Sequence, residues 1–373
     1  MVYTGIGAYI GWASEESNDS VGAYGTAADI DEAAATTDDG YQMLPYWFPM
    51  RDDTDGLEHD PGLLDVADLS NRVEGYRNKI YGQRSVGGSF TLDFQSQGME
   101  SLLEHVFLHR IQSGDVTGDP RVWTFGYMSG TGFNTYGTEG FGLTVWVNRI
   151  QDGLNVSQFS GCKVGSTTFS FEPNQPATIA CDVVGQLYDA QVTDPASGPT
   201  LTNGQRFVSG GYYSDSGTVG KLTLDQETGI GVDYVARSVS ISINHNFEER
   251  PTLQGQFPAE PYPGRPEITL EATVELDASS AVSVLNWAGD NVATGTNSPE
   301  TFSAVFGAIN TTPANDHKAV FTLPTCHLVS GGEPQVSGPG VVTMDLTFKA
   351  AYATLAPISL ALTNDNTVAL VST

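Results

Sequence analysis

The sequence predicts a mainly β protein of the α+β class, built from two tandem β-sandwich or barrel domains that each carry one short flanking helix. The first observation is composition: the chain has 42 glycines in 373 residues, and turn residues recur about every ten positions, as in proteins made of many short strands. The second observation is an apparent duplication. Residues 86–107 and 268–289 each read as an amphipathic strand followed by an amphipathic helix, and they align with each other without a gap. We therefore expect domains at 1–192 and 207–373, joined by a linker at 193–206 that is rich in turn-forming residues.

The first domain contains a long acidic segment, residues 27–72, with no clear strand or helix period. A loop of this length is uncommon inside a compact domain and tends to be functional. Its centre holds the aromatic residues Tyr46, Trp47 and Phe48. Two interpretations stay open: the aromatics pack into the chain's own core, or the segment is an arm whose aromatics dock on a neighbouring subunit.

Strands dominate the rest of the first domain. Residues 86–94 and 141–147 alternate between apolar side chains and polar or small ones, as half-buried strands do. Residues 161–185 read as two further strands, joined by a turn at 173–176. A helix after the first of these strands completes the expected α+β unit.

The second domain repeats this plan. Alternation predicts strands over 235–243 and 268–276, and the second of these leads into a helix from about Ser279, with Asp277 placed to cap it. The last strong strand, 342–348, matches the strand that begins near residue 179 in the first half, so the second copy is expected to be shorter after its helix. Each half is thus expected to be a set of antiparallel strands with one short helix across one face.

The charge of the chain is extreme, because 16 basic residues face 44 acidic ones and the formal net charge is -28. Such a surface repels itself in dilute buffer and is tolerated best where salt screens it. We interpret it first as the solubility device of a protein from a halophilic host, and second as a surface that keeps nucleic acid from sticking; the two interpretations are compatible. The sequence lacks a basic stripe interleaved with aromatics, which argues against tight nucleic-acid binding.

The sequence shows no motif for catalysis, for a cofactor or for a metal. His105 and His109 share a helical face at the spacing that metals use, but the rest of a metal motif is missing, so we expect a structural or surface role. The three cysteines give no disulfide framework. No window of about 18 apolar residues occurs, so no membrane insertion is expected, and the N-terminus does not read as a signal peptide.

Four stretches of the sequence resemble the tail tube proteins of long-tailed phages. The run GCKVGSTTFSFEPNQPATIACDVVG at 161–185 is similar to that family's alternating strand, turn and second strand. ASEESNDSVGAYGT at 13–26 resembles its opening, VARSVSISINHNFEERPTLQG at 235–255 an internal strand, and VSGPGVVTMDLTFKAAYAT at 336–354 its closing strand. The turn at 173–176 departs from the family, since Asn174 and Gln175 stand where glycines are usual. The acidic charge suggests a siphovirus-like virus of a halophilic host such as an archaeon.

This resemblance implies a non-enzymatic major tail tube protein without cofactors. Its subunits would stack in rings to form the hollow tube that delivers viral double-stranded DNA, with neighbouring sheets joined into an inner barrel. Family members with one such domain form six-subunit rings, so a two-domain chain is expected to form homotrimeric, pseudo-hexameric rings. The implied partners are further copies of the chain, the tail terminator, the baseplate or tip, and the tape measure protein, in a virion assembled in the host cytoplasm.

Within this expectation, the strands 86–94, 161–185, 268–276 and 340–350 form the channel wall. Their polar residues Thr91, Asp93, Glu271 and Glu275 are the candidate lumen-facing residues, unless they face ordinary solvent. Two other classes of protein stay open. One is a halophilic β-sandwich that binds or hydrolyses carbohydrate, although the five tryptophans are scattered; the other is a virion decoration or baseplate protein with the same fold.

Overall fold

The structure is a computed structural model of the whole chain, and it describes residues 9–15, 46–51, 56–61, 63–66, 78–108, 112–113, 121–127, 142–149, 156–192, 221–226, 232–250, 257–262, 264–276, 302–309, 317–331, 341–351 and 356–364. Most of these residues lie in antiparallel strands, and α1 (Glu100–Phe107) is the one α-helix among them. The predicted mainly β class is confirmed. The predicted linker at 193–206 and the second predicted helix, from Ser279, lie outside the described residues.

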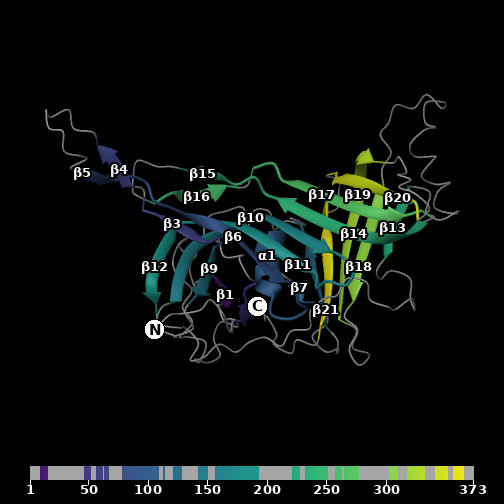
Figure 1. Cartoon of the computed structure of the whole chain (residues 1–373), viewed down its shortest axis with the longest axis horizontal. Coiled ribbons are helices and arrows are strands. Elements are labelled where there is room, and N and C mark those ends of the chain that lie inside the picture. The colour runs from purple at the N-terminus through teal and green to yellow at the C-terminus, as the bar shows by residue number, and fades with distance from the viewer. Residues whose placement is uncertain are drawn as a thin grey trace.

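A first set of paired strands forms what we call the first barrel (Figure 1). Around it, β1 pairs with β9, β9 with β10, β10 with β11, β11 with β6 and β6 with β3, while β2 lies on the other side of β1. The consecutive strands β2 and β3 thus stand at the two ends of this order. The bounds are β1 (Tyr9–Ser14), β2 (Tyr46–Pro49), β3 (Glu58–Asp60), β6 (Ser85–Asp93), β9 (Leu143–Asn148), β10 (Val156–Phe171) and β11 (Thr178–Gly185).

The second half of the chain forms a second barrel by the same order of pairings. Here β13 pairs with β18, β18 with β19, β19 with β20, β20 with β17, β17 with β14, and β14 returns to β13. The single long strand β14 therefore takes the place that β2 and β3 share in the first barrel. The bounds are β13 (Lys221–Gln226), β14 (Val232–Asn244), β17 (Glu267–Glu275), β18 (Phe302–Ile309), β19 (Lys318–Gly331) and β20 (Thr343–Ala350).

The two barrels also agree in register. Asp93 pairs with Thr178 in the first barrel and Glu275 with Thr343 in the second. The correspondence of Asp93 with Glu275 is the one that the sequence alignment of 86–107 with 268–289 requires. Thr178 then corresponds to Thr343, which shifts the last strand by two positions from the alignment that its alternation suggested. Such a shift keeps the same side chains on the same face, so alternation alone could not distinguish the two alignments.

One β-bulge occupies the same place in both barrels. The ladder between β10 and β11 shifts register between Val164 and Ser166. The ladder between β19 and β20 shifts between Leu328 and Ser330, at the same place relative to the partner strand. A β-bulge bends its strand and is a specific feature of a fold, so β10 and β19 hold equivalent positions.

Additional strands extend this plan. After β11, β12 (Leu187–Val192) pairs with β10, and β21 (Ser359–Asn364) pairs likewise with β19. The other edge of β21 pairs with β8 (Arg121–Gly126), which in turn pairs with β7 (Gln112–Ser113). The last described strand of the second half of the chain is thus paired with a strand of the first half.

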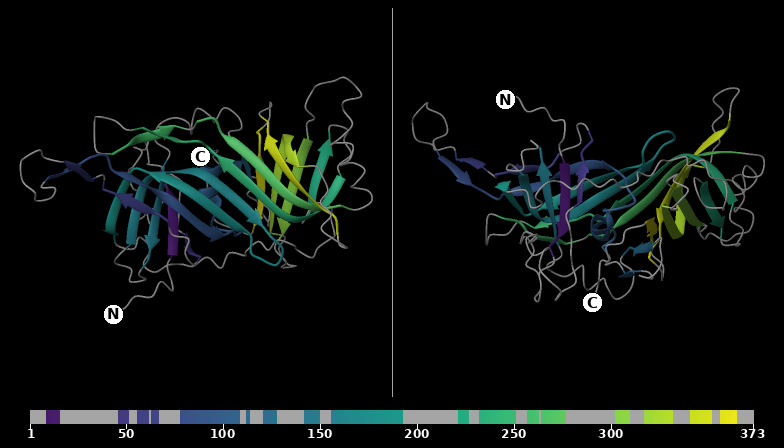
Figure 2. Two further views of the ribbon diagram at one scale, coloured as in Figure 1. Left: turned by 45° about the horizontal axis from the view of Figure 1, so that its top comes forward. Right: turned by 90° about the horizontal axis from the view of Figure 1, so that it is seen from below.

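Each barrel carries a two-stranded hairpin at the same place in the chain. β4 (Leu63–Val66) and β5 (Asn78–Tyr81) stand between β3 and β6. β15 (Glu248–Arg250) and β16 (Ala259–Tyr262) stand between β14 and β17. Their placement differs: β4–β5 projects away from the body, whereas β15–β16 lies along the first barrel (Figures 1 and 2).

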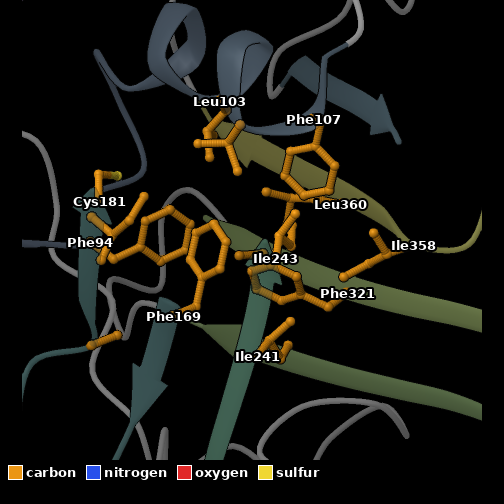
Figure 3. Packing of buried hydrophobic residues seen from close by; sticks show 14 of the residues in the cluster. Phe94, Leu103, Phe107, Phe169, Cys181, Ile241, Ile243, Phe321, Ile358 and Leu360 are labelled. Carbon is orange, nitrogen blue, oxygen red and sulfur yellow. The ribbon is translucent and has the colours of Figure 1, made fainter. Parts of the chain in front are cut away.

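The two barrels share one hydrophobic core. Leu103 and Phe107 of α1 point into it from one side, toward side chains of the second half of the chain such as Leu360 and Ile243 (Figure 3). The α1 helix therefore covers a core that belongs to both halves of the chain.

Candidate assembly interface

One antiparallel sheet runs without a break through both barrels, in the order β3–β6–β11–β10–β14–β17–β20–β19. The crossing point is the pairing of Ser166–Phe171 in β10 with Val239–Asn244 in β14. We call this pairing the joint. At the joint, the first half of the chain supplies one edge and the second half the other, so an edge that would be exposed in either barrel alone is covered.

The two faces of this sheet differ sharply. One face is apolar and buried in the shared core, and consists of Phe90, Leu92, Phe169, Phe171, Ile179, Cys181, Val183, Val239, Ile241, Ile243, Leu270, Ala272, Val274, Met344, Leu346 and Phe348. The opposite face is half-buried or exposed, and includes Ser89, Thr91, Asp93, Ser166, Thr168, Ser170, Thr178, Asp182, Ser240, Ser242, Thr269, Glu271, Thr273, Glu275, Thr343, Asp345, Thr347 and Lys349. The four residues that the sequence suggested for the lumen, Thr91, Asp93, Glu271 and Glu275, all lie on this polar face.

Charges on the polar face are partly paired. The Nη1 atom of Arg51 lies 3.6 Å from Oδ1 of Asp93, and the Nε atom of Arg237 lies 2.7 Å from Oε1 of Glu275. A hydrogen bond and the nearby charge of Lys349 lower the pKa of Glu267, so this carboxylate stays ionised.

Other carboxylates of the same face have polar or partly dry surroundings. Thr273 donates a hydrogen bond of 2.7 Å to Asp345. Partial burial raises the pKa of Asp182, against a smaller opposing effect of the Val183 backbone amide. Carboxylates outnumber cations on this face, so the surface is acidic near neutral pH.

Aromatic side chains fill the core beneath the joint. The ring of Phe169 lies 5.3 Å from that of Phe94 and 5.0 Å from that of Phe321, which belongs to the second barrel. Phe171 lies 4.9 Å from Phe306, also of the second barrel. Such ring pairs add about 0.5–1.5 kcal/mol each beyond their burial, so the joint is held by packing as well as by backbone hydrogen bonds.

A buried histidine marks one end of the joint. The backbone amide of His245 donates a hydrogen bond of 2.9 Å to the carbonyl of Gly165. The Nδ1 atom of the His245 ring lies 2.7 Å from the hydroxyl of Tyr127. Burial lowers the pKa of His245 to about 4, against a smaller opposing effect of the Val106 backbone. The side chain is therefore neutral at pH 7.

The β15–β16 hairpin clamps the second half of the chain onto the first barrel. Glu260 of β16 accepts a hydrogen bond from Lys163 of β10, and both side chains are nearly inaccessible. The Gln186 side-chain amide donates a hydrogen bond of 3.0 Å to the carbonyl of Pro258. The Arg84 guanidinium lies 5.4 Å from the centre of the Phe257 ring.

The aromatic segment 46–48 forms β2, which pairs with β1. Phe48 is buried and stacks on Trp12, with 4.5 Å between ring centres and 7° between ring planes. For Phe48 this position corresponds to the interpretation in which the aromatics pack into the chain's own core. The side chains of Tyr46 and Trp47 lie outside the described residues, so their role in an arm stays a prediction.

The titratable side chains of the described residues do not gather into a metal site. No group of three or more His, Cys, Asp or Glu side chains that could hold a metal occurs in the described part of the chain. His105 lies buried in α1, and burial lowers its pKa to about 3; His109 lies outside the described residues. Burial raises the pKa of Cys181 and of Cys326 to about 12. In the same part of the chain, no helix is long and apolar enough to cross a membrane.

Sequence reasoning missed the joint and its polar contacts. It identified 161–185 and 235–243 as strands but did not pair them with each other. Lys163 offered a usable signal, because a lysine inside the apolar run GCKVG requires a buried partner. That partner, Glu260, is 97 residues away in the sequence and could be found only from the fold.

Comparison with known proteins gives one family. A family model described as phage tail tube protein matches residues 10–350. The match covers both barrels and the joint between them. No curated protein matches the chain.

Proposed function

The chain belongs to the phage tail tube protein family, and on this basis we propose that it polymerises as stacked rings into the hollow tail tube through which viral DNA is delivered. It is a structural protein of the virion tail. Its role in this proposal is that of the major tube subunit and is not enzymatic.

The observation that carries this proposal is the continuous sheet with one polar, acidic face. A wall of this kind can line a channel because its apolar side is already covered by the core of the chain. Thr91, Asp93, Glu271 and Glu275 would face the lumen. Carboxylates at such positions repel DNA phosphates at close range, which lets DNA pass without binding.

We propose further that three chains form each ring. The two barrels agree in strand order, in register and in the position of a β-bulge, which supports an origin by duplication and domains at 1–192 and 207–373. Each barrel would then occupy one of six quasi-equivalent positions. Rings stacked head to tail grow into an open-ended filament.

The proposed surroundings follow from the tube role. The tube would end at a tail terminator and at a baseplate or tip, enclose a tape measure protein, and be assembled in the host cytoplasm. The net charge of -28 supports a siphovirus-like virus of a halophilic host, since concentrated salt screens the repulsion between subunits.

Cryo-electron microscopy of the purified protein in molar salt tests this function. Tubes of stacked six-lobed rings with true threefold symmetry are the expected result. Sixfold rings with one chain per lobe would keep the tube function and overturn the trimer. Particles that stay monomeric at every salt concentration would favour a decoration protein or a carbohydrate-binding module instead.

A further inference from the structure

We propose that the joint inside one chain is repeated between chains: β3 of one copy pairs with the end of β19 of the next, and the β4–β5 hairpin of the first copy lies over the second barrel of that neighbour. This inference rests on the proposed ring assembly and adds to it the partner strands, their register and the clamp.

Among the described strands, the continuous sheet ends at β19 on one side and at β3 on the other. Residues Leu328–Gly331 of β19 pair with β20, and no other described strand lies on their second edge. Val329 is 63% exposed there, although the equivalent Gly165 in β10 is buried at the joint. Glu58–Asp60 of β3 pair with β6 alone among the described strands. Edges of this kind favour the addition of a further strand.

The register between chains follows from the register within the chain. In the joint, Ser166 pairs with Asn244 and Thr167 with Ile243. Ser166 is the first residue after the bulge of β10, and Ser330 is the first residue after the equivalent bulge of β19. Ser330 and Gly331 therefore correspond to Ser166 and Thr167.

The corresponding residues of β3 follow from the pairing with β6 and β17. Asp60 pairs with Ser85, the first residue of β6, and Asn244 pairs with Glu267, the first residue of β17. Asp60 therefore corresponds to Asn244, and His59, the residue before it, corresponds to Ile243. We expect Ser330 of one chain to lie opposite Asp60 of its neighbour, and Gly331 opposite His59.

The two hairpins provide a second contact beside the sheet. Within the chain, β15–β16 contacts the first barrel through the Lys163–Glu260 pair and the Gln186–Pro258 hydrogen bond. The equivalent β4–β5 hairpin projects from the molecule (Figures 1 and 2). An isolated two-stranded hairpin is marginally stable in water, so β4–β5 requires a surface, and the second barrel of a neighbouring chain is the equivalent one.

The contact is heterologous, because it joins two different edges of the same chain. Contacts of this kind close into rings when the rotation between copies allows it. The joint within the chain already relates one barrel to the next, and its repetition between chains continues the same relation around the ring.

Engineered cysteines test the register. The Ser330→Cys, Asp60→Cys double variant should cross-link between chains under mild oxidation, because directly opposed residues of antiparallel strands have Cα atoms within disulfide range. A non-reducing gel should show species of two and three chains. Thr168→Cys, Ser242→Cys, which are paired inside the joint, serve as the positive control and should cross-link within one chain.

A shifted pair provides the matched negative control. In Ser330→Cys, Glu58→Cys the two positions lie diagonally, with Cα atoms about 7–8 Å apart, and should cross-link at least tenfold more slowly. Faster cross-linking of this pair would overturn the register. Tubes that form without any cross-linking of the first pair would overturn the joint and leave the proposed function standing; failure of the wild-type chain to form rings or tubes would overturn both.

Removal of the hairpin tests the clamp. Replacement of residues 63–81 by a short Gly-Ser linker should abolish ring formation in sedimentation, while the thermal unfolding midpoint of the single chain stays close to that of wild type. Rings that assemble normally without β4–β5 would overturn this part of the proposal.

Discussion

At the scale of residues, the contact of Lys163 with Glu260 shows how two halves of a chain are held together by charge as well as by packing. Burial lowers the pKa of Lys163, while the carboxylates of Glu260 and Glu15 oppose that shift. The Nζ atom also lies 5.9 Å from the centre of the Phe247 ring. A cation in such a site depends on its partner, because an unpaired buried charge is costly.

Glu260→Gln should therefore destabilise the fold. Loss of one partner of a buried ion pair lowers the free energy of unfolding by about 3–5 kcal/mol. Urea unfolding of the variant and of wild type measures this difference. Glu267→Gln, which breaks the exposed contact with Lys349, is the matched control and should unfold at the same urea concentration as wild type. Equal midpoints for both variants would show that the buried pair contributes nothing.

His245 makes stability depend on pH. An unfolded histidine titrates near 6.5, and burial lowers the pKa of His245 to about 4. Between these values the unfolded chain binds a proton at this site and the folded chain does not, so this residue's contribution to stability falls as pH falls from 6.5 to 4. The free energy of unfolding of wild type minus that of His245→Gln should shrink by about 3 kcal/mol between pH 7 and pH 4. A difference that is constant across this range would contradict the assignment.

Glu271 tests the acidic lumen. Glu271→Lys places a cation on the polar face of the sheet, where it would contact phosphates of DNA inside a tube. Tubes of this variant should retain several times more DNA on sedimentation at low salt than wild-type tubes, and lose it at high salt. Glu172→Lys, in the exposed turn between β10 and β11, is the control; equal retention by both variants would place Glu271 outside the lumen.

At the scale of elements, β10 and β14 determine how the barrels meet. β10 spans Val156–Phe171 and pairs along its length with four of the described strands, so it belongs to the first barrel and also to the joint. The bulge between Val164 and Ser166 bends the strand between these two roles. The phenylalanines after the bulge bring the core of the first barrel against that of the second.

Phe169→Ala should weaken the coupling between the barrels. The cavity that this substitution leaves should lower the free energy of unfolding by about 3–5 kcal/mol. Because the lost contacts are those that both barrels share, thermal unfolding should split into two transitions. Phe48→Ala, which opens a cavity beside Trp12 within the first barrel, should lower the melting temperature and keep one transition. A single transition in calorimetry of Phe169→Ala would show that the joint does not depend on this ring.

At the scale of the whole molecule, charge sets the conditions for folding and assembly. A net charge of -28 on 373 residues repels both within the chain and between subunits. Within the sheet, pairs such as Arg237–Glu275 relieve only part of this repulsion.

Salt should therefore stabilise the chain. An increase in sodium chloride from about 0.1 M to about 2 M shortens the Debye length from about 10 Å to about 3 Å or less, and the melting temperature should rise by more than about 5 °C. Sodium sulfate at equal ionic strength is the control, because sulfate screens charge and also strengthens apolar burial. The difference in melting temperature between the two salts therefore measures the effect on burial apart from screening. A melting temperature that is independent of sodium chloride would contradict the adaptation to salt.

Local sequence patterns were enough to predict the main strands of the sheet, such as 86–94 and 268–276, and the duplication predicted from the same patterns stays a prediction. Alternation at period two is a local property, and it correctly assigned the buried faces around Phe90 and Leu270. The alignment of the β6 region with the β17 region could also be predicted from the sequence, because both strands have nearly the same alternation of buried and exposed residues. The alignment of the last strand was wrong by two positions, since a shift of two leaves that pattern unchanged.

Which strands become neighbours could be seen only in the folded chain. The joint between β10 and β14, the contact of Lys163 with Glu260 and the stacking of Phe48 on Trp12 depend on partners far apart in the chain. The two hairpins illustrate the same limit: β15–β16 contacts the first barrel, whereas β4–β5 projects from the molecule. The physical reason is that local periodicity specifies which face of a strand is buried, whereas the choice of neighbour is made by long-range backbone hydrogen bonds and packing that form only when the chain is folded.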